Sequence, residues 1–151
     1  MQASAQKTQP QIVADAAGHI TGRLCSKIAK LLLNGNRVVV LNAEKGLISG
    51  SRSSIMREWE EWLEVGSITN PIQGPYHPRT PERIVKRMVR GMLPMKKAKG
   101  DNALKRLRVF NGIPEQYKNS KAIGFDDAKA TKPVAFYTPV GEVAKIVGWK
   151  G

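Results

Sequence analysis

Basic side chains concentrate in one stretch of the chain, at a spacing that suits binding to a polyanion. Residues 74–108 hold eleven Lys/Arg and two acids, a formal charge of +9, whereas the rest of the 151-residue chain contributes only +4. So local a charge excess indicates a binding partner rather than a fold. The eleven candidate residues are Arg79, Arg83, Lys86, Arg87, Arg90, Lys96, Lys97, Lys99, Lys105, Arg106 and Arg108.

Part of this segment has the period of an amphipathic helix over Pro81–Met92. Thr80 is a plausible N-cap, and Pro81 suits the first helical position. The helix would place its basic residues on one stripe, with no acid among them, and its apolar residues on the opposite face. An ordinary solvated face mixes the two signs of charge, so a nucleic-acid face is favoured over a solvated one. The stripe is Arg83, Lys86, Arg87 and Arg90, and the apolar arc is Ile84, Val85, Met88, Val89 and Met92.

The chemistry of the stripe favours phosphate recognition over base reading. A helix that reads the DNA major groove usually carries Asn, Gln or Ser among its basic residues, and this stripe has only Arg and Lys. Recognition by phosphate and shape is typical of structured RNA. The turn Gly91–Pro94 leads directly into Lys96, Lys97 and Lys99, so helix and loop together predict a two-sided clamp on an RNA backbone.

Enzymatic alternatives have little support. Cys25, His19 and His77 lack the spacing of a zinc site, and no glycine-rich nucleotide motif is present. The runner-up is an α/β nuclease that uses Asp15, a glutamate from residues 58–64 and a divalent metal ion. A solvated aspartate at the end of a strand is much commoner. We therefore expect no catalytic residue, no metal site and no cofactor.

Other chemically suggestive residues also have plain structural explanations. Ser49–Ser54 has the composition of a phosphate-binding helix start, although N-capping by serine is favoured. Trp59, Trp62 and Trp149 are more typical of core packing than of base stacking. Tyr76, at the head of the basic segment, is the better stacking candidate, although loop aromatics often serve as anchors.

The first third of the chain predicts a strand, a helix and a second strand, which is typical of an α/β fold with a parallel pair. Ile12–Ala14 is β-prone, a helical repeat begins at Thr21 and ends at Gly35, and Val38–Leu41 is a continuous apolar run. A second apolar piece is Leu47–Ile48, which ends at Ser49. Further predictions are helices over Arg52–Val65 and from Asp101, a strand at Val109–Phe110, and helical spacing from Val140 to Val147.

Composition bounds the organisation and the setting of the protein. Residues 1–11 read as a polar tail, without the apolar core of a signal peptide, and residues 12–151 as a single domain. No run of about 18 apolar residues is present to span a membrane. Cys25 cannot form an intrachain disulfide and lies among apolar residues, so we expect a buried thiol in a cytoplasmic protein.

Four ordered blocks lie between about Ile12 and Asn119, and the most specific is VRGMLPMKKAKGDNALKRLRVFNGIP at Val89–Pro114. Together they resemble the universal large-subunit ribosomal protein thirteen family. The Gly-Ile-Pro ending followed by Glu-Gln-Tyr looks like the archaeal and eukaryotic branch, and the length is closer to an archaeal member. The stretch 118–151 matches weakly, and RNA, a neighbouring protein or its own domain are all open as its contacts. The supporting blocks are Asp15–Gly35, Val38–Gly50 and Gly74–Ile84.

The resemblance implies a compact α/β domain with a small, largely parallel sheet between helices. It implies a non-enzymatic component of the large ribosomal subunit that binds large-subunit rRNA, supports assembly and contacts neighbouring ribosomal proteins, with no membrane or small-molecule partner. A regulatory RNA binder outside the ribosome stays open. The resemblance centres the RNA contacts on Arg79, Arg83, Arg87, Arg90, Lys96, Lys97, Lys99 and Arg106, with Gly74, His77, Gly91 and Pro94 shaping the loop.

Overall fold

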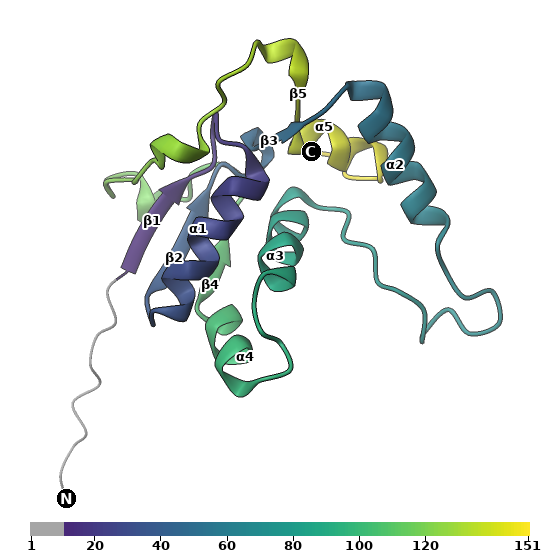
Figure 1. The fold of residues 1–151 in the computed structure, drawn as a ribbon, viewed down its shortest axis with the longest axis horizontal. Helices are drawn as coiled ribbons and strands as arrows, with labels where there is room; N and C mark the ends of the chain where they lie inside the picture. The colour runs from purple at the N-terminus through teal and green to yellow at the C-terminus, as the bar shows by residue number, and fades with distance from the viewer. Residues whose placement is uncertain (1–10) are drawn as a thin grey trace, which may run out of the picture.

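The centre of the molecule is a three-stranded parallel sheet with the strand order β1-β2-β4 (Figure 1). The computed structural model describes residues 11–151, so residues 1–10 of the expected tail lie outside the described part. Gln11, which was assigned to that tail, is the first residue of β1. The predicted strand–helix–strand unit is confirmed, because β1 and β2 pair in parallel and α1 connects them. These elements are β1 (Gln11–Asp15), α1 (Thr21–Leu33), β2 (Arg37–Leu41) and β4 (Leu107–Val109).

Helix α1 forms where the apolar period predicts it and ends as expected beside Gly35. Gly35 has φ +96°, and its N–H donates to the Leu32 carbonyl at 3.0 Å while Asn36 N–H donates to the Leu31 carbonyl at 3.2 Å. Those two bonds satisfy carbonyls that the helix end leaves free. Leu24, Ile28 and Leu32 are fully buried on its inner face.

The second part of the chain adds a small antiparallel pair and four helices. β5, which the sequence did not predict, pairs with β3. Asp101 does not cap a helix as expected, because α4 begins three residues earlier, and the predicted strand at Val109–Phe110 instead begins at Leu107. These elements are β3 (Leu47–Ser49), α2 (Arg52–Glu64), α3 (Pro81–Gly91), α4 (Ala98–Lys105), β5 (Tyr137–Pro139) and α5 (Val140–Ile146).

Alternate residues of β2 belong to two different layers of the core, one on each face of the sheet. Val38 and Val40 belong to the main core, to which α1, α3 and α4 contribute, whereas Val39 and Leu41 pack on the other face with Phe110 and Tyr117. Tyr117 ends the 3-10 helix η2 (Glu115–Tyr117), which covers that second face. The alternation follows from the pleat of a strand that is covered on both sides. α5 and α2 lie beyond α3, away from the parallel sheet (Figure 1).

Cys25 lies within the main core, as expected for a buried thiol. Its side chain is fully buried, and this burial raises the pKa of the Cys25 thiol from 9.0 to about 12, because a thiolate would lose its hydration there. Within the described residues, no helix has both the length and the apolar character needed to cross a bilayer.

Candidate nucleic-acid interface

Helix α3 carries the basic stripe on an exposed face, as its period predicts. Its inner residues Ile84, Val85 and Val89 are almost fully buried. Met92, which was expected on the buried face, is 43% exposed because it lies just after the last helical residue. Thr80 occupies the predicted N-cap position, but its hydroxyl makes no capping hydrogen bond. The stripe residues Arg83, Lys86, Arg87 and Arg90 are all exposed.

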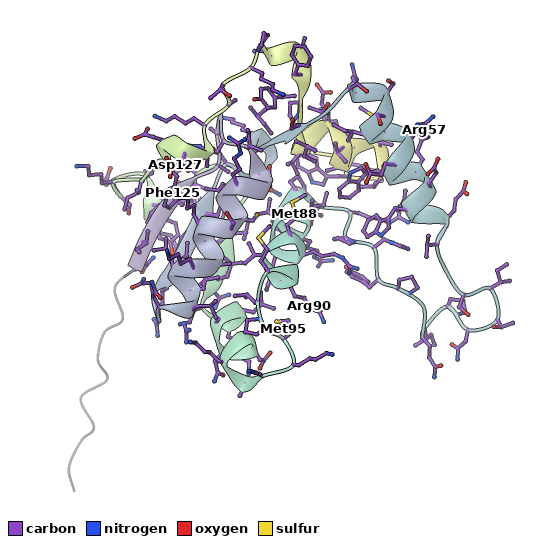
Figure 2. The ribbon with its side chains drawn as sticks, in the orientation of Figure 1. Arg57, Met88, Arg90, Met95, Phe125 and Asp127 are labelled. Atoms are coloured by element: carbon purple, nitrogen blue, oxygen red, sulfur yellow. The ribbon has the colours of Figure 1, made fainter. Side chains whose placement is uncertain are left out.

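The stripe and the following loop line two adjoining hollows. In the first, of about 490 Å³, the four stripe residues face Met95 and Leu104. In the second, of about 720 Å³, Arg87 and Arg90 face Lys96 and Lys97 across the turn (Figure 2 shows Arg90 and Met95 between α3 and α4). Asp101, which lines the first hollow, forms an ion pair with Lys105 at 2.9 Å. The fold thus brings together the two halves of the predicted clamp.

A glycine that the sequence analysis missed fixes the basic loop. A Cβ atom at Gly100 would lie 2.2 Å from the Pro94 carbonyl oxygen, far inside van der Waals contact. The loop is further held by the Lys97 N–H, which donates to that same oxygen at 3.0 Å. Gly100 therefore allows the start of α4 to pack on the turn that positions the lysines. Its place in the first turn of a helix, where glycine is unfavourable, is the signal that would have identified it.

Two arginines of the stripe also bind the loop that contains Tyr76. Arg83 Nη1 donates to the Tyr76 hydroxyl at 2.6 Å, and Arg87 Nη1 donates to the Tyr76 carbonyl at 3.0 Å. Tyr76 itself is 63% exposed. Its hydroxyl group thus anchors the loop, while its ring remains on the surface beside the stripe.

Trp62 of α2 and His77 of the loop itself hold the same loop against α2. The His77 ring packs edge-on against Trp62 at 4.3 Å between centroids, and His77 Nε2 donates to the Val65 carbonyl at 2.7 Å. The Arg87 guanidinium lies 5.5 Å from the Trp62 ring centroid, within cation–π range. Trp62 and Trp59 contact each other edge to face at 5.1 Å. Both tryptophans are half-buried: Trp59 packs against the core around Ile84, as the sequence favoured, whereas Trp62 packs on His77.

Not every candidate residue lies in the clamp. Arg79 Nη1 donates to the Val147 carbonyl at 2.7 Å, and Arg106 Nη2 donates to the Leu32 carbonyl at 2.7 Å, so both close the ends of helices. Lys99 is exposed on α4. Lys105, Arg106 and Arg108 instead gather at a different hollow, which the clamp residues do not line.

The residues of the alternative nuclease site are not brought together. Asp15 Oδ1 accepts hydrogen bonds from the Ala17 N–H and from Asn42 Nδ2, both at 2.9 Å, which is a turn-forming role. β1 and α2 lie on opposite sides of the molecule (Figure 1). Among residues 11–151, no group of three His, Cys, Asp or Glu side chains is placed to hold a metal ion. Ser51 caps α2 by accepting from the Ser54 N–H at 3.4 Å, which confirms the capping interpretation.

Known proteins are similar to this chain over a stretch that includes the basic segment. The family model described as Ribosomal protein L13 matches residues 9–116. The chain is 47% identical over 141 residues to the large ribosomal subunit protein uL13 of Archaeoglobus fulgidus, covering 92% of this chain and 88% of the relative. It is 44% identical over 142 residues to the uL13 protein of Aeropyrum pernix, covering 93% and 92%. It is 45% identical over 138 residues to that of Sulfurisphaera tokodaii, covering 91% and 94%. Such coverage extends into residues 118–151, where the resemblance was weak.

Proposed function

The chain belongs to the Ribosomal protein L13 family, and we propose that it is a structural, non-enzymatic component of the large ribosomal subunit that binds large-subunit rRNA and supports assembly. The relatives named above are large-subunit proteins. On this proposal residues 12–151 act as one ribosomal-protein domain, in contact with rRNA and with neighbouring ribosomal proteins in the cytoplasm. The RNA-binding surface is the clamp formed by α3 and the loop that follows.

One observation supports this surface above the others: six cations line two adjoining hollows. They project from a helix and from a loop held by Gly100, so the fold sets the positions of their backbones. Positioned cations bind a phosphate backbone at a lower entropic cost than free side chains do. The six are Arg83, Lys86, Arg87, Arg90, Lys96 and Lys97.

The number of cations sets the expected response to salt. Each phosphate contact adds about 0.9 to the slope of log affinity against log salt, taking the value for duplex DNA. Six contacts should then lower the affinity on the order of a thousandfold between about 50 and 200 mM salt. A flat salt response would contradict the clamp.

Gradient sedimentation of the tagged protein from cell lysate, in low and in moderate salt, tests the function. We expect the protein to migrate with the large subunit, and a variant with Lys86, Arg90 and Lys97 replaced by alanine to be lost from it as salt rises. The matched control replaces Arg23, Lys30 and Lys45, three exposed residues outside the clamp, and should stay bound. Migration as free 16.6 kDa protein in both salts would overturn the ribosomal proposal. Binding to RNA without co-migration would favour a regulatory RNA binder.

A further inference from the structure

A second basic hollow lies outside the clamp, where the N-terminal ends of β1 and β2 meet the C-terminal end of α4. Its volume is about 570 Å³, and among residues 11–151 four cations and no acidic residue line it. One of them, Arg37, comes from outside the basic segment. The polar lining is Arg37, Lys105, Arg106, Arg108, Gln11, Asn102 and Tyr117.

The register of the sheet explains why two arginines stand together there. Gln11 pairs with Arg37, and Val39 pairs with Arg108, so these residues occupy the same face of the parallel sheet. This face is the one that α1 does not cover. Arg37 and Arg108 are thus diagonal neighbours on adjacent strands, where like charges disfavour each other unless an anion lies between them.

The fold supplies almost no counter-charge for this group. Within residues 11–151, no carboxylate forms an ion pair with Arg37, Arg106 or Arg108, and residues 1–10 contain no acid. Only Lys105 has a partner, Asp101 at 2.9 Å. A cluster that is paired for structural reasons would show carboxylates among the cations.

Two polar groups in the hollow still have a hydrogen to donate. Arg106 Nη2 is used by the Leu32 carbonyl, and its buried Nε has no hydrogen-bond partner among residues 11–151. The Tyr117 hydroxyl accepts from Gln11 Nε2 at 3.3 Å, and within the described residues its own proton has no acceptor. This hydroxyl can donate its proton to a phosphate oxygen in the hollow.

The hollow is also connected to the clamp. Arg108 lines both this hollow and a smaller one of about 230 Å³, whose lining includes Arg83 and Lys86 of the stripe together with one acid, Glu82. Arg108 therefore links the cations of α3 to Arg37 across β4. The basic surface continues around the edge of the sheet and ends in the hollow.

We propose that this hollow binds a phosphate group, held by Arg37 and Arg108 from the sheet and by Lys105 and Arg106 from the end of α4. The inference rests on the proposed function, and it extends the path of the RNA backbone from α3 over β4 to a second site. Guanidinium groups suit phosphate because they donate two parallel hydrogen bonds. The phosphate comes from an RNA phosphodiester or from free phosphate, which share this chemistry.

The test compares single variants of the full chain by their binding to deproteinised large-subunit rRNA between 50 and 200 mM KCl. Arg37→Ala and Arg108→Ala should each reduce the slope of log RNA affinity against log salt by about 0.9. The loss of RNA affinity between 50 and 200 mM KCl should therefore be about 3- to 4-fold smaller for each variant than for the wild type. Arg23→Ala removes the same charge from an exposed site on α1 and should leave the slope unchanged. Arg106 is avoided because it also closes α1.

A second arm follows the NMR signals of the Arg37, Arg106 and Arg108 side chains as inorganic phosphate replaces chloride at constant ionic strength. Shifts of these signals identify free phosphate as a ligand. A reduced salt slope of RNA affinity in the variants, without such shifts, identifies the RNA phosphodiester as the ligand. If neither appears, the hollow does not bind phosphate. Arg90→Ala keeps the two proposals distinguishable. A reduced salt slope of RNA affinity for Arg90→Ala but not for Arg37→Ala overturns only the second site. An unchanged salt slope for both variants overturns the clamp.

Discussion

Replacement of Gly100 by alanine should destabilise the protein and displace the basic loop. The added Cβ would lie 2.2 Å from the Pro94 oxygen and 2.5 Å from its carbonyl carbon, and these backbone atoms cannot rotate away. Overpacking of this kind costs about 1–3 kcal/mol, more than the gain of up to about 1 kcal/mol from removing a helical glycine. We expect a net loss of about 1–2 kcal/mol, seen as a Tm lowered by about 2–8 °C, since about 1 kcal/mol shifts the Tm of a domain this size by about 2–4 °C.

Gly91→Ala provides the matched control. Gly91 is the last residue of α3, and no atom lies within 4 Å of the position its Cβ would take. The same substitution there should stabilise the protein by about 0.4–1 kcal/mol. Urea denaturation measures both effects. Binding of rRNA by Gly100→Ala should be weaker than by the wild type, because Lys96 and Lys97 move with the turn. Gly91→Ala is a control for stability alone, since Gly91 itself lines the second hollow of the clamp. Equal stability of the two variants, with RNA affinity retained, would refute the role given to Gly100.

Three further predictions separate the roles of stripe, core and thiol. Arg87→Ala should cost about 1–2 kcal/mol in stability, because its guanidinium donates to a loop carbonyl and lies over an indole ring. Arg90→Ala should instead lower RNA affinity and change stability by less than about 0.5 kcal/mol. Equal unfolding midpoints for the two variants would contradict this difference. Leu32→Ala should cost about 2–5 kcal/mol because this side chain is fully buried, and the half-buried Leu31 should cost clearly less in the same denaturation assay. Burial raises the pKa of the Cys25 thiol to about 12, so above pH 9 the unfolded chain loses a proton that the folded chain keeps. The stability should therefore fall by up to about 1.4 kcal/mol per pH unit above pH 9. A Cys25→Ala variant should lack this fall in stability.

The parts of the fold that the sequence predicted are those set by local pattern. α1 has a clear apolar period, β2 is a continuous apolar run, and Gly35 supplies the left-handed residue that ends the helix. β5 was missed because it is three residues long, contains Pro139 and is paired only through β3, far away in the chain. The start of α4 was misplaced because Lys97, at its N-cap, makes no side-chain cap, and a contact across the turn sets the boundary.

The charge pattern of the candidate site could be predicted from the sequence, but the different roles of its individual arginines could not. A count of basic residues treats Arg79 and Arg106 like the stripe, although each donates to a carbonyl at a helix end. Such carbonyls lack partners within their own helix, so a nearby arginine satisfies them. Which arginine does so depends on tertiary packing. Arg37 was missed for the converse reason, because only the parallel register places it beside Arg108.

Hydrogen bonds within the clamp distinguish two of its arginines from the two lysines of the loop, and this difference bears on how RNA is bound. Arg83 and Arg87 each use one donor on Tyr76, which fixes the direction of the guanidinium while four of its five N–H groups stay available. Fixing a long side chain in advance avoids about 0.5–1.5 kcal/mol of ordering cost on binding. Lys96 and Lys97, by contrast, are held only through their backbone turn. The arginines therefore suit defined contacts with individual phosphates, whereas the lysines contribute charge that adapts to the path of the backbone.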